Sequence, residues 1–171
     1  LTRALEVAVG DVDRKEILNE LGELLDGQMN QTDQAITYFQ RALEVDGQYL
    51  PPIENLERIF AARGQNRDLV DILAKKVVAL TAPADIATTK LRAASLYEGT
   101  LNEPAKAAQE YREVLEVDAA NLQGMRGLAR VCETLEQWPE LVKVLESELD
   151  VVATERERIE VLMHLARLQK K

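Results

Sequence analysis

The sequence has few of the side chains from which catalytic and metal sites are built. Its 171 residues contain one cysteine, Cys132, and one histidine, His164. A lone cysteine excludes an intramolecular disulfide and suits a reducing compartment, so we expect a cytoplasmic protein. Neither residue has a second cysteine or histidine at ligand spacing, so we expect no metal site. We predict that Cys132 is a buried apolar filler and that His164 lies on a helix surface.

The sequence also lacks an excess of positive charge and long apolar runs. It holds 30 acidic and 21 basic residues, a formal charge of -9, which argues against nucleic-acid and anionic-membrane partners. No apolar run approaches the roughly 18 residues of a membrane span. No glycine-rich loop carries the Lys-Ser/Thr pair that binds phosphates. We therefore expect no cofactor and no catalysis, and neither nucleic acid nor membrane as a partner.

What the sequence does have is an internal repeat. LEVDGQYL at 43–50 returns as LEVDAANL at 115–122. Aligning 1–99 with 73–171 on the same offset makes 19 of the 99 pairs identical, and fifteen of these identities fall within 24–73. Each residue is thus paired with the residue 72 positions later, and we call this spacing the repeat period. A repeat of this length is typical of architectures in which each copy covers the apolar face of the next.

The apolar residues within each copy recur at spacings of three and four, which is the period of a helix. Polar loops separate four such stretches of about 14 residues, and proline begins several of them, at Pro83, Pro104 and Pro139. Short loops require antiparallel neighbours. The sequence therefore predicts an all-α fold, a solenoid of antiparallel helix pairs with about 10 helices and a 72-residue double repeat.

These helix pairs resemble the tetratricopeptide repeat, whose pattern runs Leu-Gly, aromatic, Ala, aromatic, Ala across about 34 residues. The matching residues are Leu21-Gly22 with Ala35, Phe39 and Ala42 in one unit, and Ala94, Tyr97, Ala107 and Tyr111 in another. The resemblance covers the whole chain and implies a right-handed superhelix. The repeats are degenerate, so the related half-a-TPR and Sel1-like repeats are alternative interpretations of the helix pairs.

The resemblance divides the chain into whole and partial units of one solenoid segment. We expect a partial unit at 1–12 (a second helix), units at 13–48, 49–82, 83–120 and 121–153, and a partial unit at 154–171 (a first helix). The chain opens on Leu1 within a helical pattern and stops within another. We therefore expect a fragment of a longer protein.

In tetratricopeptide proteins the first helix of each pair lines a concave groove that binds an extended peptide. The corresponding candidates here are Asn19, Glu23, Glu54, Arg58, Arg92, Arg126, Arg130 and Arg167. Arginines along a groove are suited to bind carboxylates or phosphates, which predicts an acidic partner. The alternative is pairing within a helix, such as Glu54 with Arg58 at i,i+4.

Two functions follow from this pattern. The first is a non-catalytic interaction module that binds a peptide or protein in the groove. In that case, reversing the charges of Arg126 and Arg130 should abolish binding and leave thermal stability nearly unchanged. The alternative is a structural spacer, or a segment that self-associates through solenoid ends where Leu1, Leu5 and Leu162 would be exposed.

Overall fold

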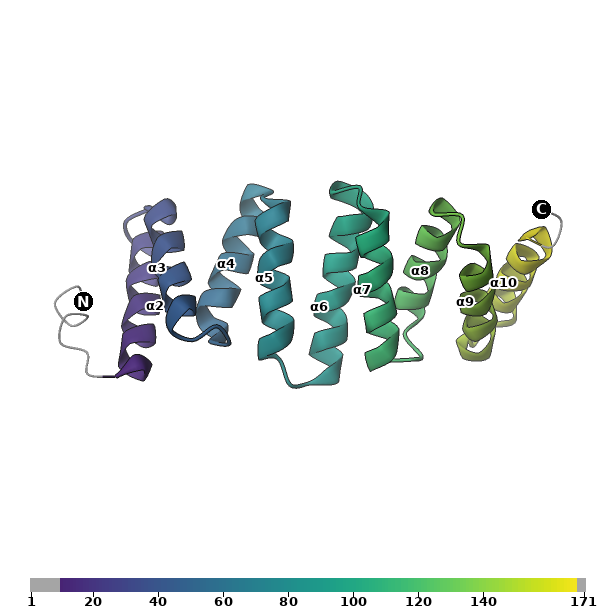
Figure 1. Ribbon diagram of the computed structural model, residues 1–171, viewed down its shortest axis with the longest axis horizontal. Helices are drawn as coiled ribbons and strands as arrows, with labels where there is room; N and C mark the ends of the chain where they lie inside the picture. The colour runs from purple at the N-terminus through teal and green to yellow at the C-terminus, as the bar shows by residue number, and fades with distance from the viewer. Residues whose placement is uncertain (1–9, 169–171) are drawn as a thin grey trace. The chain divides into compact units, whose positions relative to one another are not determined.

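The computed structural model describes residues 10–168, and every regular element in that range is a helix (Figure 1). The elements are α2 (Asp11–Gly27), α3 (Thr32–Val45), α4 (Leu50–Arg63), α5 (Asn66–Ala79), α6 (Pro83–Ser95), the π-helix η1 (Leu96–Thr100), α7 (Pro104–Val117), α8 (Leu122–Thr134), α9 (Trp138–Val151) and α10 (Glu155–Leu168). The predicted all-α solenoid of helix pairs is confirmed. The helix predicted within residues 1–9 lies outside the described residues, and the hand of the superhelix stays a prediction.

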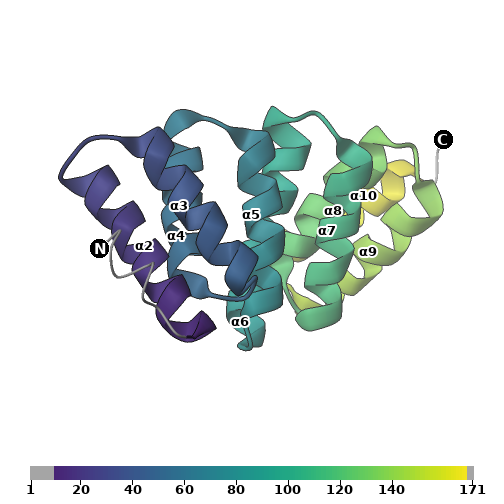
Figure 2. The same ribbon diagram turned by 60° about the vertical axis from the view of Figure 1, so that its left-hand side comes forward.

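The helices belong to two compact units, Leu1–Thr81 and Ala82–Lys171. Within each unit a helix packs against the next one in the chain, from α2 to α5 in the first and from α6 to α10 in the second (Figures 1 and 2). We call α2, α4, α6, α8 and α10 the first helices, and α3, α5, α7 and α9 the second helices. Packing against sequence neighbours is the arrangement expected of a helical-repeat protein.

The core of the first unit is built around an aromatic ring that lies on a glycine. Phe39 of α3 is fully buried together with Ala35 and Ala42, which recur at helical spacing on one face. A Cβ atom placed on Gly22 of α2 would lie 2.5 Å from Cε1 of Phe39. The glycine of the Leu-Gly pair therefore lets the ring reach the backbone of α2.

The second unit also packs an aromatic ring against a glycine of a neighbouring helix. Tyr111 of α7 lies one repeat period after Phe39 and is also buried. Its ring lies against Gly127 of α8, where a Cβ would overlap the ring. Cys132 is buried in the same core, which confirms its predicted position.

The backbone conformation of the turns also follows the repeat. Four of the described residues have a left-handed backbone, with φ of 56° at Asn30, 52° at Asn102, 66° at Gly64 and 57° at Glu136. They form two pairs, Asn30 with Asn102 and Gly64 with Glu136, and the members of each pair lie one repeat period apart. The repeat therefore extends to backbone conformation, even where glutamate replaces glycine.

The ends of α2 and α6 share a wide turn. The amide of Met29 donates to the carbonyl of Leu24 at 3.3 Å, and the amide of Leu101 donates to that of Leu96 at 2.9 Å. Both bonds join residues i and i+5, as in a π-helix, and they lie one repeat period apart. A π-type turn takes up one residue more than an α-turn.

Candidate functional site

In the first unit, hydrogen bonds join the predicted groove residues of α2 to each other and to α4. Glu23 Oε1 accepts from Asn19 Nδ2 at 2.8 Å and from Asn55 Nδ2 at 3.3 Å. Asn19 is buried, and its Oδ1 has no hydrogen-bond partner in the part of the chain that the structure describes. These contacts tie neighbouring first helices together through polar side chains.

Arg58 pairs across helices rather than within its own. Its Nη2 donates to Asp26 Oδ2 at 2.5 Å, so the alternative pairing with Glu54 is wrong. The hydrogen bond from Arg58 holds the pKa of the Asp26 carboxyl below its usual value. Glu54 itself is exposed on α4.

The equivalent pair in the second unit is between Arg130 of α8 and Glu98 of η1. Arg130 donates from Nε and Nη2 to the two oxygens of Glu98, at 2.8 and 3.0 Å. Tyr111 donates its hydroxyl to the same carboxylate at 2.7 Å. The hydrogen bond from Arg130 lowers the pKa of Glu98, and that from Tyr111 acts in the same direction. A planar guanidinium and a carboxylate match in this two-bond geometry.

Arg126, one turn before Arg130, bridges two further helices. Its Nε donates to Glu148 of α9 at 2.7 Å, and its Nη2 donates to Glu157 of α10 at 2.9 Å. Glu157 also accepts from the hydroxyl of Thr154 at 2.7 Å, which is the largest cause of its lowered pKa. Arg126 therefore joins α8, α9 and α10 at one point.

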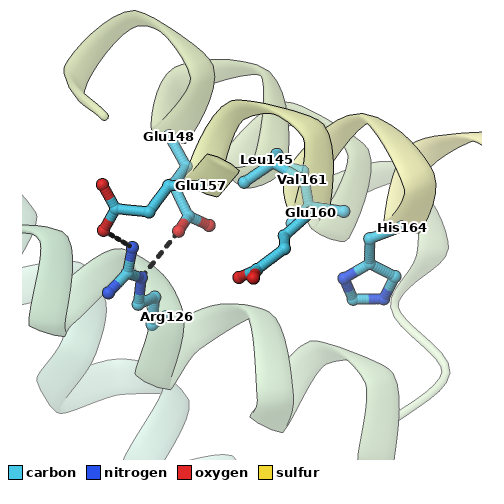
Figure 3. A pocket seen from close by; sticks show the side chains of 7 residues that line it. All are labelled: Arg126, Leu145, Glu148, Glu157, Glu160, Val161 and His164. Atoms are coloured by element: carbon cyan, nitrogen blue, oxygen red, sulfur yellow. Dashed lines mark hydrogen bonds and ion pairs between the residues drawn. The ribbon is translucent and has the colours of Figure 1, made fainter. Parts of the chain in front are cut away.

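A cavity of about 250 Å³ opens beside this junction, between α8, α9 and α10 (Figure 3). We call it the α8–α10 cavity; its lining residues are Arg126, Leu145, Glu148, Glu157, Glu160, Val161 and His164. Figure 3 shows Glu160 and His164 projecting from α10 on the side that faces α8. Two of the lining side chains, Leu145 and Val161, are apolar, and the other five are polar or charged.

A second hollow, of about 430 Å³, adjoins this cavity because the two share Glu160 and His164. Its other lining residues are Glu133, Arg167 and Leu168. His164 Nε2 lies 3.3 Å from Glu133 Oε1, so the predicted surface histidine contacts the neighbouring first helix. Arg167 makes no ion pair or hydrogen bond with any described residue.

The predicted site residues thus fall into two groups. Asn19, Glu23, Glu54 and Arg58 belong to the first unit, and Arg92, Arg126, Arg130 and Arg167 to the second. Only two of them, Arg126 and Arg167, line the cavities of the second unit. The carboxylates that line the cavities were not predicted from the sequence; they are Glu133, Glu148, Glu157 and Glu160.

One sequence signal could have revealed the pairing of the arginines. Arg58 and Arg130 lie one repeat period apart, and so do their acceptors, Asp26 and Glu98. In each copy an acidic residue therefore precedes the arginine by 32 positions. That distance is close to one helix pair, so it places the two side chains on adjacent first helices.

A further hollow, of about 470 Å³, lies in the first unit between α3, α4 and α5. It is lined by Gln40, Leu43, Glu44, Leu56, Phe60, Asp68, Asp71, Ile72 and Lys75. None of the predicted groove residues lines it. Most of its lining comes from second helices, so it is distinct from the site predicted on the first helices.

The described residues offer no group of three metal-ligating side chains, and no helix among them is long and apolar enough to cross a membrane. Burial raises the pKa of the Cys132 thiol to about 11. The thiol is therefore protonated at neutral pH, which makes it a poor nucleophile.

Comparison with known proteins supports the assignment made from the residues. Residues 15–49, which contain most of α2 and all of α3, match the family model described as Tetratricopeptide repeat. No curated protein sequence matches the chain.

Several solved structures share the fold at low sequence identity. YrrB, described as a TPR protein with an unusual peptide-binding site, is 12% identical with a TM-score of 0.54, over 88% of this chain and 73% of its own. MamA is 15% identical with a TM-score of 0.54, over 93% and 86%. A tetratricopeptide repeat protein from Parabacteroides merdae ATCC 43184 is 14% identical with a TM-score of 0.53, over 99% and 67%. The chain therefore contains one segment, residues 15–49, that matches the tetratricopeptide repeat, and its fold is similar to that of solved tetratricopeptide-repeat proteins.

Proposed function

We propose that this chain is a non-catalytic interaction module that binds a peptide or protein segment on its first helices, at the α8–α10 cavity and the adjoining hollow. Tetratricopeptide proteins bind protein or peptide partners on extended surfaces of this kind. The observation that carries the proposal is a pair of adjoining cavities lined by α8 and α10, with Arg167 at the rim and no described partner for it.

The charged residues around the two cavities indicate which charged groups a ligand could carry. Arg58, Arg126 and Arg130 already hold carboxylates of this chain, so they are not free to bind those of a partner. Arg167 is the arginine best placed to bind one carboxylate of a ligand. The same hollow contains Glu133 and Glu160, which would repel a second acid. The proposed ligand therefore carries a single carboxylate beside neutral or basic residues.

An apolar group of the ligand would fill the α8–α10 cavity. Leu145 and Val161 line its floor, and both are largely buried. A side chain that enters this space exchanges water contact for contact with their methyl groups, which is favourable for an apolar ligand. The peptide is thus expected to place an apolar residue near its acidic residue.

A structural or self-associating role is the alternative, and one observation favours it. Three large apolar side chains of α10 are about half exposed, including the predicted Leu162. Sedimentation across a range of concentrations distinguishes the two functions, because a self-associating chain changes its mass with concentration. Leu1 and Leu5, also predicted to be exposed, lie outside the described residues. A cytoplasmic location stays a prediction.

A binding selection from a library of random and C-terminal peptides tests the proposal. The chain, the variant Arg167→Glu and the control Lys143→Glu are used in parallel. Lys143 is exposed on α9 and lines neither cavity, so its reversal controls for net charge. A motif with one carboxylate near an apolar residue, enriched by the chain and the control but lost with Arg167→Glu, supports the proposal. No enrichment, or the same motif with Arg167→Glu, contradicts it.

A further inference from the structure

One difference between the two copies of the repeat changes the charge on a second helix. The second unit has Arg112 on α7, and one repeat period earlier the first unit has Gln40 on α3. Arg112 donates from Nε and Nη2 to the two oxygens of Glu140 on α9, at 2.6 and 2.7 Å. Its Nη2 also donates to Gln137 Oε1 at 3.1 Å. The second unit therefore joins α7 to the start of α9 with a guanidinium of its own.

The first unit keeps the acceptors of this arrangement and lacks the donor. Glu140 and Gln137 correspond to Asp68 and Gln65. Gln65 Nε2 donates to Asp68 Oδ2 at 3.0 Å, but Gln65 Oε1 is buried and accepts no hydrogen bond from any described residue. The side chain of Gln40 makes no hydrogen bond with a described residue either. A buried acceptor without a donor is unfavourable, so this position favours a donor supplied by a ligand.

The hollow of about 470 Å³ between α3, α4 and α5 lies beside these acceptors, because Gln40 and Asp68 both line it. Two further carboxylates, those of Glu44 and Asp71, line the hollow, and neither pairs with any described residue. Of the described residues that line the hollow, Lys75 alone is basic, so the carboxylates outnumber it three to one. This excess of negative charge favours a cationic ligand.

The apolar part of the lining suits the aliphatic stem of an arginine side chain. Leu43, Leu56, Phe60 and Ile72 line the hollow, and each is at most 9% exposed. An arginine packs its methylene groups on such a surface and keeps its charged end among polar groups. Phe60 takes the place of Cys132 in the other copy. An aromatic ring adds an attraction for a guanidinium, which stacks on its face.

We propose that the hollow between α3, α4 and α5 binds an arginine side chain of a partner protein, in the place that Arg112 occupies in the second unit. The guanidinium donates to the carboxylate of Asp68 and to Gln65 Oε1, and the charges of Glu44 and Asp71 attract it. A lysine is a poorer ligand, because an ammonium lacks the planar pair of donors that matches a carboxylate.

The net charge of the chain favours a different protein as the source of this arginine. A second copy of the chain also carries a formal charge of -9, so two copies repel each other, whereas a basic partner is attracted. The hollow belongs to the first unit and the α8–α10 cavity to the second. The proposal therefore does not depend on the function proposed for that cavity.

Titration of the ¹⁵N-labelled chain with the peptide acetyl-Leu-Arg-Leu-amide, followed by amide chemical shifts, tests the proposal. The control peptide has citrulline, which is uncharged and similar in shape, in place of arginine. The variant Gln40→Arg supplies an internal guanidinium like that of Arg112, and Asp68→Asn removes the carboxylate. Gln34→Arg makes the same substitution at an exposed position of α3 that does not line the hollow. All three replaced residues are exposed, so the variants are expected to fold, and circular dichroism verifies this.

The expected result is a set of saturable shifts around Leu43, Asp68 and Ile72 with the arginine peptide. Gln40→Arg and Asp68→Asn should each weaken binding about tenfold or more, because each removes charge-assisted hydrogen bonds from the ligand. Gln34→Arg should leave binding nearly unchanged. Arg167→Glu should do the same, since it changes only the other unit.

Three results of the titration overturn the proposal: no saturable shifts, equal binding of the citrulline peptide, or unchanged binding by Gln40→Arg. Sedimentation of the chain alone tests the other source of an arginine. A mass that rises with concentration, and that Asp68→Asn returns to the monomer value, also overturns the proposal and assigns the hollow to a second copy of the chain.

Discussion

Arg126 donates from Nε to the carboxylate of Glu148 at 2.7 Å, although Glu148 is only 4% exposed. The pair connects α8 with α9, and the same guanidinium continues to Glu157 on α10. A carboxylate this far from water needs a partner, because an unpaired buried charge is strongly unfavourable. Arg126 is therefore part of the packing of the unit, which changes what its substitution should do.

Replacing Arg126 by alanine is expected to destabilise the chain by about 1–3 kcal/mol, because it leaves Glu148 buried without its donor. Charge reversal to glutamate should cost more, which differs from the sequence-based expectation that reversal leaves stability nearly unchanged. Urea unfolding followed by circular dichroism measures the change. The control is Arg156→Ala, which removes an exposed i,i+4 pair with Glu160 and should change stability by less than about 0.5 kcal/mol. Equal unfolding midpoints for the two variants would show that the buried pair is dispensable.

Gly22→Ala should destabilise the first unit by about 1–3 kcal/mol, since the added methyl group overlaps the ring of Phe39. Gly27→Ala is the matched control on the same helix, where a Cβ meets no atom within 4 Å. There alanine should be neutral or slightly stabilising, because it restricts the unfolded chain. Thermal unfolding of the two variants measures the difference. A similar loss in both would mean that backbone freedom, rather than contact with Phe39, explains the glycine.

Glu136→Gly should stabilise the second unit by about 1 kcal/mol, because glycine adopts a left-handed backbone without the steric cost of a side chain. The reciprocal change, Gly64→Glu, should destabilise the first unit by a similar amount at the equivalent turn. For a chain of this length we expect melting temperatures to move by about 2–4 °C in opposite directions. Shifts of the same sign would contradict the explanation from backbone strain.

The pair between Arg130 and Glu98 should make stability depend on acid pH. Arg130 lowers the pKa of Glu98 in the folded chain below its ordinary value of 4.5. The resulting stabilisation is complete above about pH 4.5 and is lost as the pH falls through the folded pKa. Arg130→Gln should therefore differ most from the unchanged chain at neutral pH, and the two unfolding curves should converge in acid.

The control for this pH dependence is Arg63→Gln. Arg63 pairs with Asp33, whose side chain is 88% exposed, so its removal should have little effect at any pH. Urea unfolding midpoints between pH 3 and pH 7 provide the comparison. A constant difference between Arg130→Gln and the unchanged chain across this range would exclude the ionisation of Glu98 as its source.

The fold could be predicted from the sequence because the information is local and repeated. Apolar spacing and turn residues define each helix, and the repeat period aligns the core, as with Phe39 and Tyr111. The repeat even aligns left-handed turns, although Glu136 gave no sign of one by residue type. The π-type turn after α6 was not predicted, because hydrophobic spacing does not distinguish it from a loop with one extra residue.

The candidate site was harder to predict because ion pairs depend on geometry between helices. Helical spacing places Arg126 and Arg130 on a first helix and predicts that their charges are available to a partner. Their acceptors lie 22 to 32 residues away, in Glu148, Glu157 and Glu98. Helical periodicity relates residues three or four apart and contains no information on such distant pairs.

The central claim is that a peptide binds beside α8 and α10, and amide chemical shifts test it most directly. The ¹⁵N-labelled chain is titrated with the peptide that the selection enriches. We expect the largest shifts around Glu133, Glu160, His164 and Arg167, and we expect Arg167→Glu to abolish them. Shifts confined to the second helices, or to the hollow between α3, α4 and α5, would contradict it.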